Sequence, residues 1–341
     1  MCKISLYLFP LLLFLGAAPA IKTFRISGKA QGTSYHITYY AKDSIISKTD
    51  IENLLKELDN SLSIYQPNSL ISQFNNSAKG LKVDRHLRKV VQESLSVYKE
   101  TNGIFDITSY PILAAWGFGT EKVVGFPDSA RIDNLMLCVG SDKILLQNDF
   151  LEKTVPCIKL DVNGIAQGYS VDVLANFLDS KKIDCYMVEI GGELKVKGKK
   201  PDGTYMKVGI EGPATDNRDE PFVRRIVTLK KGAITTAGNY RKYIEKENKR
   251  ISHLIDARTG HPIENEMISV TVVAKNAITA DGYDTPLMGM NLKEALVFMR
   301  KHPDMQAYFI YRKSNGAMAD TATVGFYSLI DSDKSGQAGP D

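Results

Sequence analysis

The segment "ITADGYDTPL" (278–287) places two carboxylates and a hydroxyl between two hydrophobic segments. Asp281, Asp284 and Thr285 are spaced i, i+3 and i+4, which on a helix brings their oxygens to one face. Hard cations such as Mg²⁺ take oxygen ligands of this kind, with substrate phosphates and water completing the shell. The competing interpretation is a helix cap, in which Asp284 or Thr285 precedes Pro286 at the first turn of a helix. The residues alone leave both interpretations open.

A second stretch, "LDVNGIAQGYSVD" (160–172), places Asp161 before a glycine-containing turn that opens a helix. Helix N-termini present free N–H groups and partial positive charge, so such turns suit phosphates and nucleotides. The stretch matches neither G-x-x-x-x-G-K-[ST] nor G-x-G-x-x-G, so neither common nucleotide motif applies. The alternative is structural, with Asp161 or Asn163 as a helix cap and with Gly164 and Gly168 permitting close packing.

The stretch "SHLIDARTGHP" (252–262) combines basic, acidic and hydroxyl side chains. Asp256 to Gly260 is typical of a turn, in which Asp bonds to its own backbone and Gly takes positive φ. Ser252 and His253 are adjacent on a strand and point to opposite faces, so they do not form a nucleophile–base pair. His253 and Arg258 together suit an anionic ligand. A structural turn and an anion site therefore both remain open.

Two further stretches carry ligand-like patterns. In "GAITTAGNYRKY" (232–243), Thr235, Thr236 and Gly238 end a predicted strand, as either ligand-facing groups or a β-bulge. In "FDITSYPILAAWGFG" (105–119), Trp116 is the only tryptophan and Gly117 follows it. A lone Trp is usually part of a core, but beside glycines it could stack on a flat heterocycle.

These residues need a scaffold, and the hydrophobic pattern predicts one. Helical spacing covers 50–65, 85–103, the segment after 163 and 291–302, whereas 65–80 is a polar loop. Strand-like segments are 24–41, 157–160, 185–198, 205–212, 224–238, 251–256, 267–274 and 305–312. Helices clustered early and a run of strands without regular alternation predict an α+β fold. We expect one large domain with mixed or antiparallel sheets and helices packed on them.

Composition narrows the function classes. The chain is 43% hydrophobic and 24% charged, which is ordinary for a packed globular protein. Its formal charge of +4 is spread along the chain, so we expect no nucleic-acid binding. Cys138, Cys157 and Cys185 are too widely spaced for a disulfide framework or a zinc site. Buried free cysteines are favoured, and one disulfide with unassigned partners is the alternative.

The N-terminus has the pattern of a secretory signal peptide. Residues 1–20 contain one Lys, an apolar run over 6–15 and the end Ala18-Pro19-Ala20, which fits an A-x-A cleavage site. Cys2 precedes the apolar run and is not placed as a lipid acceptor. We expect an exported, periplasmic protein that is soluble after cleavage. Its domain would cover 21–330, followed by a frayed tail at 331–341.

Four of these stretches occur together and in order: "LDVNGIAQGYSVD", "MVEIGGELKVKG", "SHLIDARTGHPI" and "VTVVAKNAITADGYDTPLMGM". Combined, they resemble the ApbE family of FAD:protein FMN transferases. The earlier stretches "QGTSYHI", "SLSIYQPNSLISQFN" and "FDITSYPILAAWGFG" match the N-terminal pattern of that family. The resemblance spans residues 30–311 and implies an ApbE-like, T-fold-related form of the α+β fold.

The resemblance also implies an activity. Family members split FAD with Mg²⁺ and transfer FMN, through a phosphoester bond, to a Thr hydroxyl of a target flavoprotein, releasing AMP. The targets are typically redox subunits of Na⁺-pumping or Rnf-type complexes, so the chain would meet a membrane only through its acceptor. By position, the metal ligands would be the side chains of Asp281 and Thr285 and the backbone carbonyl of Gly164. FAD would be bound by Gln31, Tyr65, Ala115, Trp116, Gly117, Asp161, Gln167, His253, Ile255, Asp256 and Ile263.

Attack by a Thr hydroxyl requires removal of its proton, and Asp284 and His253 are the candidates. We expect His253 to orient a phosphate, and Asp284 to act as the base or to support the metal ligands. This chain departs from the family pattern at four places. Asn163-Gly164 replaces a Gly-Gly or Ser-Thr pair. Gln31 replaces a common Met, and Gln167 replaces a common Lys or Glu, which argues against an ionic contact there. Pro286 replaces a helix former, which argues against a regular helix.

Two other functions suit the same residues. A Mg²⁺-dependent FAD pyrophosphatase would release FMN and AMP to water from the same site. A non-catalytic exported FAD-binding protein would not need the pair formed by Asp281 and Thr285. An assay with FAD alone and with FAD plus a Thr-bearing acceptor distinguishes the three.

Overall fold

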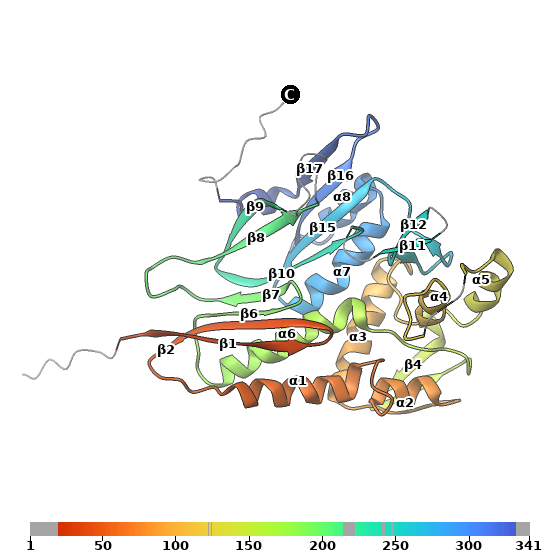
Figure 1. Cartoon of the computed structure of the whole chain (residues 1–341), viewed down its shortest axis with the longest axis horizontal. Helices are drawn as coiled ribbons and strands as arrows, with labels where there is room; N and C mark the ends of the chain where they lie inside the picture. The colour runs from red at the N-terminus through yellow and green to blue at the C-terminus, as the bar shows by residue number, and fades with distance from the viewer. Residues whose placement is uncertain are drawn as a thin grey trace, which may run out of the picture.

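An eight-stranded antiparallel sheet forms the centre of the computed structural model, which describes residues 20–121, 123, 125–213, 222–240, 243–246 and 249–331. The strand order is β1-β2-β6-β7-β10-β15-β16-β17, and Figure 1 shows the sheet running from the β1–β2 hairpin to the β16–β17 hairpin. The strands are β1 (Lys22–Ala30), β2 (Thr33–Ala41), β6 (Tyr186–Ile190), β7 (Glu193–Lys197), β10 (Lys231–Gly238), β15 (Met267–Ala274), β16 (Gln306–Arg312) and β17 (Met318–Ala322).

Helices cover one face of this sheet, and a β-hairpin covers the other. The helices are α1 (Lys48–Leu62), α3 (Arg85–Glu100), α6 (Asn163–Ser180), α7 (Ala277–Gly289) and α8 (Leu292–Arg300). Two hydrophobic clusters fill this face, one packing α1 and α6 on β2 and β6 and the other packing α3 and α7 on β15. On the opposite face, β8 (Met206–Gly212) and β9 (Phe222–Leu229) pack with the short α9 (Val324–Tyr327). In Figure 1 this hairpin lies above β6 and β7, and α1 lies below them. The predicted α+β class is confirmed.

The β1–β2 turn consists of two residues with positive φ, Gln31 at 51° and Gly32 at 75°. Two positive φ angles give a hairpin turn whose twist matches that of the flanking strands. The strand-like segment predicted over 24–41 is therefore a tight hairpin.

Two local predictions are wrong. The polar loop expected over 65–80 contains the helix α2 (Leu70–Asn76). Ser69 caps this helix, and its residues Ile71 and Phe74 are buried. The strand expected at 157–160 does not form, although Ile158 and Leu160 are buried. In the first place capping and burial decided the structure more than composition. In the second, the backbone N–H and carbonyl of Leu160 bond to the side chain of Asn75 instead of to a neighbouring strand.

Smaller elements surround the sheet at one end. The strands β3 (Gly80–Lys82), β5 (Phe150–Lys153) and β4 (Ile144–Gln147) form a three-stranded sheet next to the 3₁₀ turn η1 (Ser141–Lys143). Two short hairpins pair β11 (Tyr243–Lys246) with β12 (Lys249–Ser252) and β13 (Ile255–Asp256) with β14 (His261–Pro262). The helices α4 (Tyr110–Ala115) and α5 (Ser129–Met136) pack beside these hairpins around Trp116.

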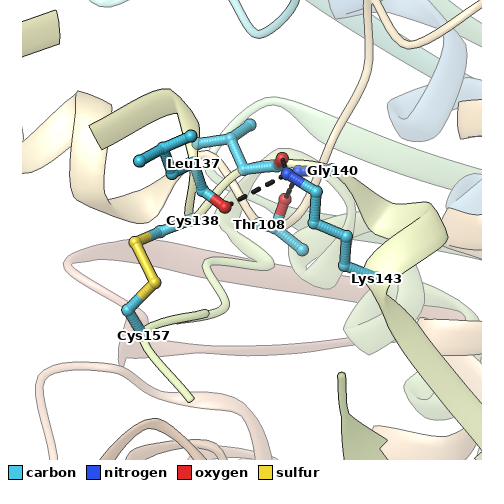
Figure 2. The surroundings of a disulfide bond; sticks show 7 residues. Thr108, Leu137, Cys138, Gly140, Lys143 and Cys157 are labelled. Atoms are coloured by element: carbon cyan, nitrogen blue, oxygen red, sulfur yellow. Dashed lines mark hydrogen bonds between the residues drawn. A yellow bond between two sulfur atoms is a disulfide. The ribbon is translucent and has the colours of Figure 1, made fainter. Parts of the chain in front are cut away.

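A disulfide joins Cys138, just after α5, to Cys157, just before the segment that leads into α6 (Figure 2). The favoured interpretation of free cysteines is therefore wrong for this pair, and it holds for Cys185, which is free and buried. Beside the bridge, Lys143 Nζ donates to the carbonyls of Leu137 and Val139 at 3.1 and 2.6 Å. The sequence separation of 19 gave no preference for this pairing, because the β4–β5 hairpin that lies between the two cysteines was not predicted.

Within the described ranges, no helix has the length and apolar character needed to cross a membrane. The predicted signal peptide (1–20) and tail (331–341) lie outside the described residues, apart from Ala20 and Asp331.

Candidate active site

The helix α7 carries Asp281, Asp284 and Thr285, whose i, i+3 and i+4 spacing puts them on one face of the helix. It runs from Ala277 to Gly289 and contains Pro286 in its interior. The cap interpretation is therefore wrong, because Asp284 and Thr285 lie inside the helix. Pro286 has no N–H for the preceding turn. Packing tolerates this cost, since α7 is buried on nearly all sides.

Asp281 and Asp284 are both buried, at 5% and 3% exposure. Burial, followed by the charge of Asp284, raises the pKa of Asp281 well above its usual range. Burial, followed by the charge of Glu193, likewise raises the pKa of Asp284, while the hydroxyls of Thr235 and Thr285 act in the opposite direction. Thr285 Oγ1 donates to Asp284 Oδ1 at 3.2 Å. The pair is a concentrated acidic centre inside the protein.

The first turns of α6 lie directly against these acids. The Gly168 N–H donates to Asp281 Oδ2 at 2.7 Å. In a regular helix this N–H would donate to the Gly164 carbonyl. Because this N–H donates to Asp281 instead, the Gly164 carbonyl oxygen is left able to bind another partner. A Cβ on Gly168 would lie 2.6 Å from Asp281 Cβ, so the expectation of close packing at Gly168 is confirmed.

These residues fit a hard cation. Among the described residues, no Lys, Arg or His forms an ion pair with Asp281 or Asp284. A buried charge without such compensation costs several kcal/mol, which a bound cation would offset. No cluster of three or more His, Cys, Asp or Glu side chains suited to a metal occurs in the described part of the chain. The predicted ligand set therefore relies on the Thr285 hydroxyl and the Gly164 carbonyl beside a carboxylate, which are oxygen donors that Mg²⁺ accepts.

Two hairpin tips meet α6 near this centre. Gln31 Nε2 donates to Ser170 Oγ at 2.7 Å, and Gln31 Oε1 is buried without a hydrogen-bond partner among the described residues. In the β6–β7 turn, a Cβ on Gly191 would lie 2.8 Å from Gln167 Nε2 and 3.3 Å from Glu193 Oε2. The predicted residues Gln31 and Gln167 are thus both at the α6 face that the hairpins approach.

Sequence reasoning missed Glu193 as a site residue and left Thr235 undecided. Glu193 begins β7 and is the first charge to act on Asp284. Thr235 is fully buried on β10, which pairs with β15 without a register shift, so the bulge interpretation is wrong. The acidic residue after a double glycine in "EIGGEL" was the available signal for Glu193.

At the N-terminus of α6, Tyr65 and Asp161 come together. Burial, followed by the charge of Asp161, raises the pKa of Tyr65, and a hydrogen bond with Asn163 opposes the rise. Asp161 Oδ1 accepts from the Asn163 N–H at 2.8 Å, so Asp161 does bind the first turn while Asn163 is a helix residue rather than the cap. Tyr65 remains 59% exposed, which leaves its ring available to a ligand.

A second group surrounds the β13–β14 hairpin. Trp116 is 8% exposed, and its Nε1–H donates to the Gly260 carbonyl at 2.8 Å. The core interpretation of Trp116 is therefore confirmed. Gly260 has φ +73°, and its N–H donates to the Asp256 carbonyl at 2.8 Å, so the predicted turn is confirmed too. Burial opposes ionisation of Asp256, but the hydrogen bonds and charge of Arg258 outweigh it and lower the pKa of Asp256.

The remaining predicted residues lie in or beside this second group. Ala115 and Ile255 are buried, and Gly117 has φ +95° directly after Trp116. The His253 ring lies edge-on to Phe118 with centroids 6.3 Å apart. A Cβ on Gly289 would lie 3.3 Å from Ile263 Cδ1, so Ile263 packs at the end of α7, one turn beyond Thr285. The two groups of predicted contacts are therefore joined by α7.

A cleft of about 2120 Å³ opens beside the second group. Trp116 and Ile263 line it, together with His261, Tyr240 and Tyr243. The acidic residues of α7 do not line this cleft. The cleft and the acidic centre are thus separate features of the same region.

Comparison with known proteins gives this geometry a family. A family model described as "ApbE family" matches residues 31–309. The FAD:protein FMN transferase of Vibrio cholerae is 37% identical over 287 residues, covering 82% of this chain and 85% of the relative. That of Haemophilus influenzae is 33% identical over 316 residues, covering 89% and 90%.

Solved structures agree. The flavin transferase ApbE from Vibrio cholerae superposes with a TM-score of 0.82 at 32% identity, covering 91% of this chain and all of that one. The apo flavinyl transferase ApbE of Pseudomonas stutzeri gives 0.81 at 31% identity, covering 91% and 97%. These relatives carry the names of enzymes, and the chain belongs to the ApbE family.

Proposed function

We propose that this chain transfers FMN from FAD to a Thr hydroxyl of an acceptor flavoprotein, forming a phosphoester bond and releasing AMP, in a Mg²⁺-dependent reaction. The observation that carries the proposal is the buried pair of Asp281 and Asp284, set against the N-terminal turns of α6 in a member of the ApbE family. The relatives named above are FAD:protein FMN transferases.

The cation would be held by Asp281, Thr285 and the Gly164 carbonyl. When bound beside a pyrophosphate, Mg²⁺ neutralises charge on the leaving group and polarises phosphorus. The chain itself supplies the N–H groups and positive end of the α6 dipole, which favour an anionic substrate. Burial makes the ionised carboxylates of Asp281 and Asp284 unfavourable, and a bound cation would compensate their charge.

Asp284 is suited to take the proton of the acceptor hydroxyl. Burial, followed by the charge of Glu193, raises the pKa of its carboxyl, which makes it a stronger proton acceptor than an exposed aspartate. The Thr oxygen then forms a bond to the FMN phosphorus as the bond to the AMP oxygen breaks, and the proton passes through Asp284 to the leaving phosphate or to water. His253 would orient a phosphate from the second group.

The two groups of predicted contacts suit the two ends of an elongated dinucleotide. Gln31, Tyr65, Asp161 and Gln167 lie around the start of α6, whereas Ala115, Trp116, Gly117, His253, Ile255, Asp256 and Ile263 surround the β13–β14 hairpin. FAD would run between them along α7, with its pyrophosphate near Asp281.

We also propose that the protein is exported and acts on redox subunits such as those of Na⁺-pumping or Rnf-type complexes, reaching a membrane only through them. The leader-like residues 1–20 and the bond between Cys138 and Cys157 support export, because disulfides persist mainly in oxidising compartments.

The test is an acceptor assay. The protein is incubated with FAD, Mg²⁺ and a Thr-bearing acceptor peptide, and the peptide gains the mass of FMN while AMP appears in equal amount. FMN released to water with the acceptor present and unmodified would support a pyrophosphatase instead. Asp281→Ala should abolish transfer, and Asp149→Ala, at an exposed aspartate, should not. Full transfer by Asp281→Ala at Mg²⁺ levels that limit the wild type would refute the ligand assignment.

A further inference from the structure

The N-terminus of α7 is capped by a residue of another helix. Its own N-cap residue, Asn276, makes no side-chain capping hydrogen bond. Instead the carboxylate of Asp172, on α6, accepts from the Ala277 N–H at 3.0 Å and from the Ile278 N–H at 2.9 Å. Helix N-termini leave such N–H groups unpaired unless a side chain accepts them. The start of α7 is therefore held by α6.

Lys195 completes this contact from the sheet. Its Nζ lies 2.6 Å from Asp172 Oδ1, and the two side chains are only 12% and 9% exposed. Lys195 is two residues after Glu193 on β7, so both side chains leave the same face of the strand. Lys195 pairs with Asp172, and the charge of Glu193 acts on Asp284. A single strand face therefore contacts both the capping carboxylate and the acidic centre.

The capping contact lies one helical turn from the contact between Gly168 and Asp281. Asp172 follows Gly168 by four residues, and Asp281 follows Ala277 by four. Each helix thus gives a carboxylate to an N–H of the other, in two adjacent contacts. A Cβ on Gly168 would lie 2.4 Å from the Ala277 carbonyl, so the helices have no free space in which to slide. A shift of the α7 N-terminus would therefore move Asp281.

We propose that Asp172 and Lys195 are positioning residues, which hold the N-terminus of α7 where Asp281 and Thr285 can share one cation with the Gly164 carbonyl. Neither residue touches the cation or the substrate in this arrangement. The inference rests on the proposed function for the identity of the cation, and it adds the device that sets the ligand geometry.

The experiment measures Mg²⁺ binding without turnover. Thermal unfolding of the FAD-free protein is followed as Mg²⁺ is titrated, and the concentration that gives half of the rise in melting temperature is compared between variants. Lys195→Met and Asp172→Asn should raise this midpoint about tenfold, as loss of groups that orient metal ligands typically does. Lys195→Arg keeps the charge and should restore a midpoint near that of the wild type.

Lys197→Met is the matched control. Lys197 lies on the same strand and also pairs with α6, through Asp179 at 2.9 Å, and with Asp184 at 3.2 Å. Its removal should lower the melting temperature without moving the Mg²⁺ midpoint. If Lys195→Met does not fold, Lys195→Gln, which removes the charge that pairs with Asp172, carries the same comparison and should also raise the midpoint.

If Lys195→Met and Asp172→Asn keep the Mg²⁺ midpoint of the wild type and only lower the melting temperature, the ion pair is purely structural and the proposal is overturned. An equal rise in Lys197→Met would overturn it as well. A wild type that shows no response to Mg²⁺ overturns the inference, because there is then no cation to position. FMN transfer is assayed in the same samples. A wild type that binds Mg²⁺ but transfers no FMN counts against the proposed function alone.

Discussion

Gly168 lies at a close approach of α6 to α7, beside the acidic centre. Its N–H bonds Asp281, and its missing side chain leaves room for the Ala277 carbonyl. Gly164, one turn earlier, has no comparable demand, since a Cβ there would meet only Phe105 at an ordinary 3.5 Å. The two glycines therefore have different roles, one in helix contact and the other in offering its carbonyl.

Gly168→Ala should disrupt the site more than it disrupts the fold. The added Cβ would lie 2.4 Å from the Ala277 carbonyl, which must force α7 away from α6. Overpacking of this kind costs about 1–3 kcal/mol. We expect a loss of that size in urea unfolding, together with loss of FMN transfer.

Gly164→Ala is the control for this change, because it keeps the carbonyl and adds a methyl group in ordinary contact. It should retain stability and transfer activity. Equal behaviour of the two variants would contradict the roles assigned to them.

Single residues also show the limit of sequence reasoning. The spacing of Asp281, Asp284 and Thr285 predicts that their oxygens share one face if the segment is a helix, but the spacing alone left a helix cap equally open. Glu193 could not be found in this way, because it reaches Asp284 from a strand about 90 positions earlier. Contacts between segments distant in the chain have no local signal.

At the scale of elements, burial overrides local propensity. Pro286 argued against a helix, yet α7 continues through it because the helix is enclosed by α3, α6 and β10. The 65–80 segment is polar, yet Ser69 caps α2 within it and Phe74 is fully buried. Helices α1 and α3, in contrast, were predictable from their periodicity. Periodic elements can be predicted from sequence, whereas elements stabilised by their neighbours cannot.

The C-terminus of α2 is held by a buried lysine, which predicts a pH dependence. Lys153 Nζ donates to the carbonyls of Asn75 and Ser77 at 3.3 and 2.9 Å, above the ring of Phe74. Burial, followed by the charge of Lys159, lowers the pKa of Lys153 to about 8. Between that value and the ordinary 10.5, the unfolded chain binds a proton that the folded chain lacks. Stability therefore rises with pH in this window, and the full cost of the buried charge is present below pH 8.

Lys153→Met removes this titration. The unfolding free energy of the wild type, relative to the variant, should increase as pH rises from about 8 to 10.5, measured by urea unfolding at several pH values. Lys82→Met, at a side chain with 79% exposure, is the control and should show no such trend. A difference between wild type and Lys153→Met that is independent of pH would contradict the burial of a charged ammonium.

For the whole molecule, the fold class and the family were accessible from sequence because several motifs occur in a fixed order over most of the chain. The assembly of those motifs was not accessible. The structure arranges them as two groups joined by α7, and the turns of the β1–β2 and β6–β7 hairpins lie against α6. The pairing of Cys138 with Cys157 was also not accessible, since three cysteines allow three pairings and only tertiary structure selects one.

The disulfide links the stability of the molecule to its compartment. It closes a loop with a sequence separation of 19 between α5 and the segment leading to Asp161. A loop of this length restricts the unfolded chain and stabilises the fold by about 3 kcal/mol. The double variant Cys138→Ser/Cys157→Ser should lose about that amount in urea unfolding, and a reductant should destabilise the wild type but not the variant. Cys185→Ala keeps the bridge and should remain sensitive to the reductant.

Mass analysis of the protein recovered from its host tests the same bond together with the proposed leader. Cleavage after Ala20 gives a chain that begins at Ile21, and the bridge makes it two hydrogens lighter than the reduced form. After denaturation without reductant, only Cys185 should react with a thiol reagent. A chain without residues 1–20 should stay in the cytosol, with all three thiols reactive, because that compartment keeps thiols reduced. Retention of Met1 would refute cleavage, and three reactive thiols in the exported chain would refute the link between compartment and bridge.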